Sequence, residues 1–318
     1  MTNRPLHVRA LRVSITRACD MRCFYCRTGH EKSGHDALSL PFVARLCEAL
    51  RRRFGLQLVR LTGGEPLCRP DVVEWVRRLS TLGPEVAMTT NGQRMAHVAA
   101  ALHDAGLVRV NFSLDTLDEK TFERMSGGRL ADTILGIEAA LKAGLSPVKC
   151  NTVVMRGWNE DELADLAAWC LERGIEPRFL ELMNVGVAHR HHARWFVSAE
   201  EILRRLSESY ELRPLGRSPG CTAARYVAAK GGRPMGTLGI IAPESEPFCE
   251  DCARLRLSAD GQLFGCFMQD RGIDLAECLS LEGAADEKLL DRLILKALSC
   301  KAGIRSLRRR RAVVEIGG

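Results

Sequence analysis

The stretch LRVSITRACDMRCFYC (residues 11–26) joins an apolar, β-branched segment to three cysteines. We expect its first six residues to form a strand, which Cys19, Cys23 and Cys26 follow with the spacing C-x3-C-x2-C. A structural zinc site or an ordinary iron–sulfur cluster takes four protein ligands. Three cysteines therefore predict a metal centre with one open position, unless a zinc ion takes its fourth ligand from elsewhere, for example His30.

Segments of strand type alternate with amphipathic helical segments up to about residue 210. The alternation gives six β-α units, and we expect their strands to be parallel because helical segments lie between them. The predicted strands span residues 11–16, 57–66, 85–92, 107–115, 148–157 and 177–186, and the predicted helices span 40–55, 71–83, 93–105, 131–144 and 160–173. In parallel α/β folds the ligand site lies at the carboxyl ends of the strands, where the first cysteines also lie.

From about residue 211 the pattern changes to shorter strands and turns. We expect strands within 224–229, 236–241 and 254–266 and a helix over about 287–300. The predicted fold class is therefore α/β. A partial, TIM-like (βα)6 barrel occupies residues 1–210, two units short of a closed barrel, and a smaller C-terminal α+β domain occupies residues 211–318.

The bulk composition is typical of a soluble globular protein. The chain has 318 residues, of which 46% are hydrophobic and 27% charged, and no apolar run reaches the length of a membrane span. The N-terminus shows no signal-peptide core, so we expect a cytoplasmic protein without a membrane partner. The cytoplasm keeps thiols reduced, so disulfides are not expected among the 13 cysteines.

The net charge of +7 does not by itself indicate a nucleic-acid partner. Much of it lies in one run, RSLRRRR at residues 305–311, and only 5% of the residues are aromatic. Proteins that bind single-stranded nucleic acid combine basic grooves with aromatic side chains that stack on bases. The charge indicates bound phosphate groups but does not distinguish a nucleotide from a polymer. A nucleic-acid-binding protein with two zinc sites is the less favoured class, because it lacks interleaved aromatic and basic residues and leaves the motifs TGGEP and TTNG unexplained.

A second group of three cysteines, Cys249, Cys252 and Cys266, has the spacing C-x2-C-x13-C. It again lacks a fourth ligand, and we expect an auxiliary [4Fe–4S] cluster that binds the substrate directly. Arg254 and Arg256 follow on a predicted strand, where alternate residues point to the same face. Two guanidinium groups on one face suit a phosphate or a purine edge.

The first cysteine group resembles that of the radical S-adenosylmethionine (SAM) enzymes, because Tyr25 precedes its last cysteine and the turn LTGGEP lies at residues 61–66. The resemblance implies that three thiolates hold a [4Fe–4S] cluster and that SAM binds the open iron. Glycine in the turn lets the backbone approach the methionine moiety closely. With this turn present, the zinc alternative is less favoured.

Further motifs narrow the resemblance to the GTP 3′,8-cyclase family, also called molybdenum cofactor biosynthesis protein A. They are RLTGGEPL (60–67), TTNG (89–92), VNFSLDTLD (110–118), RFLELM (178–183), PFCEDCARLRLSADGQLFGC (247–266) and the terminal Gly317–Gly318. The resemblance implies that a 5′-deoxyadenosyl radical from SAM takes the C3′ hydrogen of GTP, and that C3′ then attacks C8 of guanine. The product, (8S)-3′,8-cyclo-7,8-dihydroguanosine 5′-triphosphate, would pass to cyclic pyranopterin monophosphate synthase in molybdenum cofactor biosynthesis.

The same resemblance assigns roles residue by residue. The ligands of the two [4Fe–4S] clusters would be Cys19, Cys23 and Cys26, and Cys249, Cys252 and Cys266. The SAM contacts would be Tyr25, Gly64, Ser113 and Met183. The GTP contacts would be Arg12, Arg60, Thr89, Lys149, Arg178, Arg254, Leu255 and Arg256, with Gly317 and Gly318 reaching into the site. A reductant such as flavodoxin or ferredoxin is also implied; homodimers occur in the family, but no segment here demonstrates one.

The sequence departs from the family pattern at positions beside these motifs. Arg17-Ala18 stands where Asp-Arg is usual, Asp20 where Asn is usual, Arg27-Thr28 where Met-Pro is usual, and Leu58 where lysine is common. None of them is a cluster ligand. They keep an alternative open, a diverged radical SAM enzyme with an auxiliary cluster that acts on another substrate such as a peptide. The basic residues assigned to GTP favour a phosphorylated substrate over a peptide.

Overall fold

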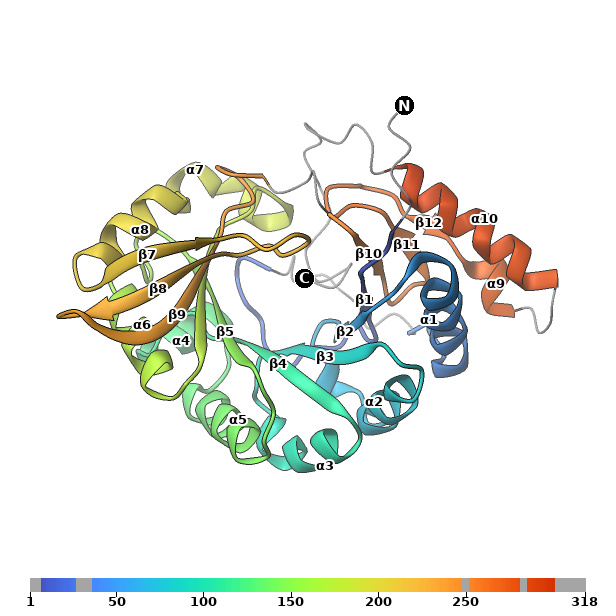
Figure 1. Cartoon of the computed structure of the whole chain (residues 1–318), viewed down its shortest axis with the longest axis horizontal. Helices are drawn as coiled ribbons and strands as arrows, with labels where there is room; N and C mark the ends of the chain where they lie inside the picture. The colour runs from blue at the N-terminus through green and yellow to red at the C-terminus, as the bar shows by residue number, and fades with distance from the viewer. Residues whose placement is uncertain (1–6, 27–35, 248–251, 281–284, 301–318) are drawn as a thin grey trace.

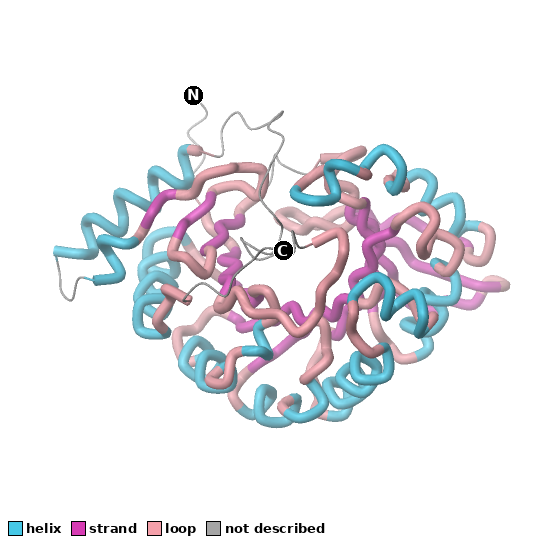
Figure 2. The backbone as a smooth tube through the Cα atoms, turned by 180° about the vertical axis from the view of Figure 1, so that it is seen from behind, coloured by secondary structure: helices cyan, strands magenta, loops and turns pink. Residues whose placement is uncertain are grey.

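The computed structural model describes residues 7–26, 36–247, 252–280 and 285–300. Its strands form one twelve-stranded sheet that curves into an open barrel, with helices around the outside (Figure 1). Seen from behind, strands line the inner side of the arc and helices cover its outer side (Figure 2). No helix within these ranges is long and apolar enough to cross a membrane.

Six parallel strands and the helices between them form the barrel wall, which confirms the predicted (βα)6 unit. The strands are β1 (Ala10–Ser14), β2 (Leu58–Thr62), β3 (Glu85–Thr90), β4 (Leu107–Ser113), β5 (Val148–Val154) and β6 (Glu176–Glu181). The helices are α1 (Leu40–Phe54), α2 (Val72–Ser80), α3 (Ala99–Asp104), α4 (Glu119–Ser126), α5 (Leu130–Lys142), α6 (Leu163–Glu172), α7 (His192–Trp195) and α8 (Ala199–Ser207), with short 3-10 turns η1 (Pro66–Cys68), η2 (Met95–His97) and η3 (Gly186–Arg190). The sequence pattern does not predict α4, α7 or α8.

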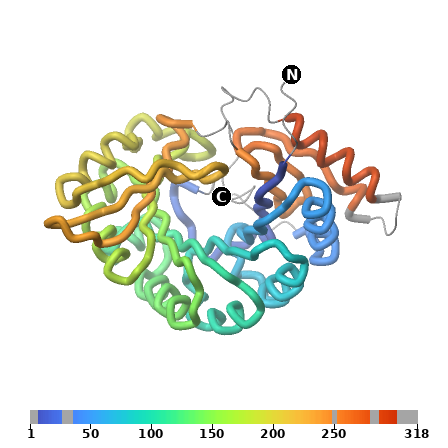
Figure 3. Tube along the Cα trace, viewed as in Figure 1, coloured from blue at the N-terminus to red at the C-terminus, as the bar shows by residue number. Residues whose placement is uncertain are grey.

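The chain after residue 210 adds strands to both edges of the same sheet. Its elements are β7 (Glu211–Gly216), β8 (Ala224–Lys230), β9 (Arg233–Ile241), β10 (Arg254–Leu257), β11 (Gln262–Phe264), β12 (Ile273–Asp274), α9 (Ala276–Ser280) and α10 (Ala285–Ser299). β9 pairs in parallel with β6, and β10 pairs in parallel with β1. Eight parallel strands therefore run in the order β10-β1-β2-β3-β4-β5-β6-β9, and antiparallel strands extend both ends. In Figure 3 the orange C-terminal strands lie at both ends of the arc, beside the blue β1 at one of them.

Side chains alternate along each barrel strand between an apolar outer layer and a polar interior. In β5, Cys150, Thr152 and Val154 are buried toward the helices, whereas the alternate residues Lys149 and Asn151 are less buried and face the interior. Successive residues of a strand point to opposite faces of the sheet. The apolar core therefore lies between the sheet and the helices, and polar side chains line the inside of the barrel.

Helix α1 illustrates why these segments form helices with the observed bounds. The Ser39 side chain caps its start by accepting a hydrogen bond from the Phe42 backbone N–H (3.4 Å), and Pro41 lies in the first turn. Gly55 ends the helix with φ 71° and donates its N–H to the Leu50 carbonyl. A left-handed residue at this position favours glycine, so the predicted glycine stop is confirmed. The helix thereby returns the chain to the amino end of β2.

Candidate active site

The first cysteine group lies in the loop that follows β1, at the carboxyl end of the barrel strands. Cys19, Cys23 and Cys26 are half-buried, and the Cys26 N–H donates to the Cys23 carbonyl (3.0 Å) in a tight turn. Burial, reinforced by Cys26, Asp115 and Cys19, raises the pKa of the Cys23 thiol well above its ordinary value. Without a nearby positive charge this thiol stays protonated, whereas a bound cation would favour the thiolate.

The glycine turn after β2 fixes the position of this cysteine loop. The Gly64 N–H donates to the Thr16 carbonyl (2.8 Å), and the Glu65 N–H donates to the Ala18 carbonyl (2.7 Å). A methyl group on Gly64 would overlap the Ala18 carbonyl oxygen and lie 2.6 Å from that of Arg17. The sequence suggested that glycine here admits the methionine moiety of SAM. The structure adds that glycine lets two backbone segments of the chain itself approach each other.

Glu65 joins the turn after β2 to the TTNG turn after β3. Its carboxylate accepts hydrogen bonds from Thr90 Oγ1 (2.7 Å) and the Asn91 N–H (2.7 Å), and burial raises its pKa to about 7. The Asn91 side-chain amide donates to Asp20 (2.7 Å), and the Arg94 guanidinium donates to the same carboxylate (2.9 Å). Asp20 therefore ties the cysteine loop to the TTNG turn.

An aromatic cluster holds the other side of the cysteine loop. Phe24 stacks on Trp158 with ring centroids 4.4 Å apart and meets Trp195 edge-on at 5.0 Å. The Tyr25 hydroxyl donates to the Asp115 carboxylate (2.5 Å), and burial raises the pKa of Asp115 to about 6. Residues that follow β4, β5 and β6 thus all contact the loop that follows β1.

Basic side chains line the middle of the barrel interior. Arg12, Arg60 and Arg256 are neighbours across β1, β2 and β10, and we call these three residues the basic row. Lys149 and Arg178 lie further along the sheet on β5 and β6. Burial and cationic neighbours lower the pKa of Arg12 to about 10 and that of Arg60 to about 9. An anion among these side chains would relieve their mutual repulsion.

Four buried side-chain atoms have no hydrogen-bond partner among the described residues, namely Thr89 Oγ1, Asn111 Oδ1, Asn151 Oδ1 and Arg225 Nε. Thr89 pairs with Asn111 across β3 and β4, and Asn111 pairs with Lys149 across β4 and β5. Leaving such an atom buried and unpaired costs about 1–3 kcal/mol. Thr89 and Asn111 lie one pleat nearer to the carboxyl ends of the strands than the basic row, and Asn151 lies two pleats nearer. A ligand bound there would satisfy them.

The two described cysteines of the second group, Cys252 and Cys266, lie at the opposite end of the strands. Cys252 comes two residues before β10, and β10 runs parallel to β1, so Cys252 lies at the amino end of the barrel. Cys266 follows β11, which is antiparallel to β10, and therefore lies at the same end. The basic row thus lies between two cysteine groups.

Comparison with known proteins identifies the family. Residues 13–170 match the model of the Radical SAM superfamily, and residues 175–305 match that of Molybdenum Cofactor Synthesis C. A GTP 3′,8-cyclase of Moorella thermoacetica is 40% identical over 318 residues, which cover 97% of each chain. One of Paenarthrobacter nicotinovorans is 40% identical over 300 residues, which cover 89% of this chain and 83% of the relative. This chain belongs to the GTP 3′,8-cyclase family.

A solved structure of SuiB from Streptococcus suis, bound to S-adenosylmethionine, has the same fold as this GTP 3′,8-cyclase family member. The TM-score is 0.66 at 16% identity, over 95% of this chain and 69% of SuiB. At this identity the likeness extends to the fold alone. It confirms the predicted fold class.

The donor atoms fit the cofactors of the GTP 3′,8-cyclase family, which are SAM and [4Fe–4S] clusters. In the described part of the chain, no three His, Cys, Asp or Glu side chains converge on one metal ion. Each cysteine of a four-iron cluster binds a different iron, so the three thiols of the first loop need not converge. The unpaired polar atoms between that loop and the basic row could accept or donate hydrogen bonds to a ligand bound there.

The structure brings most of the predicted site residues to one interior. The residues assigned to SAM lie in the first cysteine loop or at the carboxyl ends of β2, β4 and β6. Leu255 differs, because its side chain is fully buried in the apolar core, on the face opposite Arg254 and Arg256. Leu255 can therefore contact a substrate only through its backbone atoms. Cys249, Gly317 and Gly318 lie outside the described residues, as do His30, Arg27 and Thr28.

Sequence reasoning missed polar residues that this site contains. They are Glu65, Asn111, Asp115, Asn151, Glu176 and Arg225. The alternation of strand residues could have found Asn111 and Asn151, because they lie two residues from Ser113 and Lys149. Arg225 gives no local signal, since it reaches the interior only through the pairing of β8 with β9.

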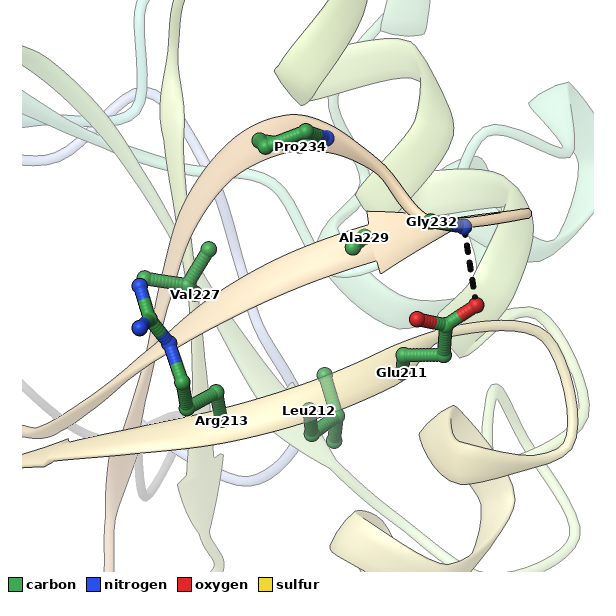
Figure 4. A pocket seen from close by; sticks show the side chains of 7 residues that line it. All are labelled: Glu211, Leu212, Arg213, Val227, Ala229, Gly232 and Pro234. Atoms are coloured by element: carbon green, nitrogen blue, oxygen red, sulfur yellow. Dashed lines mark hydrogen bonds between the residues drawn. The ribbon is translucent and has the colours of Figure 1, made fainter.

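A separate hollow of about 290 Å³ lies on β7, β8 and the start of β9 (Figure 4). Its lining includes Glu211, Arg213 and Pro234, and Glu211 accepts a hydrogen bond from the Gly232 N–H (3.0 Å). No site residue predicted from the sequence lines it. The candidate site is therefore the barrel interior.

Proposed function

We propose that this chain catalyses the GTP 3′,8-cyclase reaction, converting GTP to (8S)-3′,8-cyclo-7,8-dihydroguanosine 5′-triphosphate in molybdenum cofactor biosynthesis. The observation that carries the proposal is the half-buried basic row between the cysteines at the two ends of the barrel. A nucleoside triphosphate suits this row because its phosphates require several cations. Its sugar and base can then extend toward the two ends.

The residues of the chain bind and orient the reactants in this proposal. Arg60, Lys149 and Arg178 neutralise the phosphate groups, and Thr89 and Asn111 offer hydrogen bonds between the phosphates and the first cysteine loop. When bound, the first cluster and SAM supply the carbon-centred radical that removes hydrogen from ribose C3′. The barrel holds C3′ toward SAM, keeps C8 of guanine within reach of C3′, and excludes water from both.

We also propose that this chain acts in the cytoplasm, with an electron donor and a downstream enzyme as its partners. Flavodoxin or ferredoxin supplies the electron, and cyclic pyranopterin monophosphate synthase takes up the product. The cytoplasm suits a chain with 13 cysteines, because it keeps thiols reduced. A homodimer is included as well, and light scattering of the purified protein tests it.

A peptide substrate is the less favoured function for this interior. A neutral peptide would displace water from the buried guanidinium groups and offer them no counter-charge, which costs several kcal/mol per buried ion. A polyphosphate supplies that charge.

The decisive experiment uses protein purified without oxygen, reconstituted with iron and sulfide, and supplied with dithionite, SAM and GTP. Mass spectrometry should detect 5′-deoxyadenosine and an isomer of GTP that elutes separately, from protein that binds about eight irons per chain. Formation of 5′-deoxyadenosine without the isomer would mean that the substrate is not GTP. Bound zinc without SAM cleavage would contradict every radical SAM function.

A further inference from the structure

Glu176 is a buried carboxylate at the start of β6 on which three basic side chains converge. Lys149 Nζ donates to both of its oxygens (3.2 Å each), and Arg178 Nε donates to one of them (2.7 Å). A terminal guanidinium nitrogen of Arg225 lies 3.3 Å from the other oxygen. The side chains of Glu176, Lys149 and Arg178 are 10%, 12% and 16% exposed, so water screens the contacts among them little. The Arg225 side chain is 41% exposed, so its contact with Glu176 is screened more. One carboxylate does not neutralise three cations, and the cluster keeps a positive charge.

Arg225 reaches this cluster from the C-terminal part of the chain. β8 pairs with β9 and β9 pairs with β6, which sets Arg225, Gly239 and Arg178 side by side across three strands. A methyl group on Gly239 would lie 3.2 Å from Arg178 Cγ and 3.1 Å from Ala223 Cβ. The absence of a side chain at Gly239 therefore leaves room for the two guanidinium groups on either side of it.

Arg225 also has a buried donor that nothing in the described chain uses. Its terminal nitrogen donates to Thr237 Oγ1 (3.1 Å) and contacts Glu176. Its Nε is buried and has no hydrogen-bond partner among the residues that the structure describes. Because a charged donor is costly to leave buried and unpaired, this atom points to an anionic ligand.

We propose that Arg225 binds a phosphate oxygen of the substrate, and that Glu176 is a positioning residue that holds Lys149, Arg178 and Arg225 together before the substrate binds. The inference rests on the proposed function, because GTP is the polyphosphate concerned. Without the Glu176 charge, the three cations repel one another and separate.

Lys149 is the member of the cluster that depends most on Glu176. The charged groups that face Lys149 are Glu176 and Arg178 on β6 and Arg225 on β8. Burial, together with the positive charge of Arg178, lowers the pKa of Lys149 to about 8. Only Glu176 among them favours the protonated amine. Loss of the carboxylate therefore lowers the protonated fraction of Lys149 and also releases Arg178 and Arg225 from their positions.

The test measures dissociation constants for GTP and inorganic tripolyphosphate with the reconstituted protein. Arg225→Gln should weaken both ligands about tenfold, as expected for one charge-assisted hydrogen bond. Glu176→Gln should weaken both about threefold although it removes a negative charge, and Glu176→Asp should restore most of the affinity. In turnover, KM should rise by the same factors while kcat stays within about twofold.

Two matched variants control for the chemical changes. Arg233→Gln at the exposed end of β9 and Glu172→Gln on the exposed side of α6 should leave both dissociation constants unchanged. Arg225→Lys keeps the charge and loses the Nε donor, and it should weaken the binding of both ligands about threefold. This variant replaces Arg225→Gln in the test if the glutamine variant does not fold. Melting temperature and iron content report on folding.

The possible outcomes separate this inference from the proposed function. Tighter binding by Glu176→Gln would overturn the positioning role, because the carboxylate would then only compete with phosphate. Unchanged binding by Arg225→Gln would overturn the role of Arg225. Wild-type protein that binds tripolyphosphate but not GTP would contradict the proposed function, and the tripolyphosphate constants of the variants would still decide the inference.

Discussion

Lys149 shows how the barrel interior alters the chemistry of a single side chain. It is 12% exposed, and burial together with Arg178 lowers its pKa to about 8, while Glu176 acts in the opposite direction. A lysine in water has a pKa of about 10.4. The amine of Lys149 is therefore charged below about pH 8 and loses its charge as the pH rises through that value.

The affinity for GTP should accordingly fall, by up to about tenfold, between pH 7 and pH 9 as Lys149 loses its proton. Lys149→Arg should remove this decrease, because a guanidinium stays protonated throughout the range. Equilibrium binding at several pH values measures both proteins. Lys142→Arg, on the exposed end of α5, should keep the wild-type pH dependence. A Lys149→Arg variant with that same dependence would assign it to another group.

Gly64 is a second residue whose role follows from its immediate surroundings. Gly64→Ala would place a methyl group against the Ala18 and Arg17 carbonyls, and the cysteine loop would have to move. We expect the variant to bind about four irons per chain in place of eight, because only the first cluster is affected. Iron analysis before SAM is added separates this effect from a loss of SAM binding.

Gly174→Ala is the control for that substitution. Gly174 has φ +69° and nothing within 4 Å of an added methyl group, so alanine there carries backbone strain of about 1–2 kcal/mol and no collision. It should retain about eight irons. Equal iron contents in the two variants would mean that the turn after β2 does not hold the cysteine loop.

Individual site residues were predictable from the sequence where the residues that form a motif lie within a few positions of one another. The first cysteines, the glycine turn and the alternation of Arg254 with Arg256 are of this kind, since each pattern spans only a few residues. Glu65 and Asp115 lie within recognisable motifs, but their partners, Thr90 and Tyr25, lie in other turns. A hydrogen bond between turns leaves no periodic signal in the chain.

At the scale of elements, the loops after β4, β5 and β6 hold the loop after β1. Trp158 and Trp195 reach Phe24 from the segments after β5 and β6, and the Arg124 guanidinium of α4 covers the Trp158 ring at 5.0 Å. Neither α4 nor α7 is predicted from the sequence, because each is short and irregular segments flank it. The packing of these segments on Phe24 stabilises them in the folded protein.

Trp158→Ala should therefore loosen the cysteine loop as well as lower stability. Truncating a half-buried tryptophan costs about 2–3 kcal/mol, which lowers the melting temperature by a few degrees. Trp169→Ala, at a half-buried tryptophan of α6 that does not contact the loop, should lower it similarly. Only Trp158→Ala should speed the release of iron to a chelator. The same release rate in both variants would contradict a role for the aromatic cluster in holding the loop.

At the scale of the whole molecule, the predicted boundary at residue 210 divides a single sheet. Arg12 of β1 pairs with Arg256 of β10, and Arg178 of β6 pairs with Gly239 of β9. The sequence indicated the strands on both sides of the boundary. It did not indicate that the later ones flank the earlier ones, because parallel pairing between segments so far apart depends on the closure of the whole chain.

A chain that ends at residue 210 should consequently fail to fold alone. It would expose both edges of a parallel sheet, at β1 and β6, and would lose the buried side chains of Leu238, Ile240, Leu255 and Leu257. Unpaired strand edges invite aggregation. We expect no cooperative thermal transition in circular dichroism and strong binding of a hydrophobic dye, whereas the full chain should melt cooperatively. A shortened chain that melts cooperatively and binds four irons would instead establish residues 1–210 as an independent domain, with the later strands docking onto a preformed barrel.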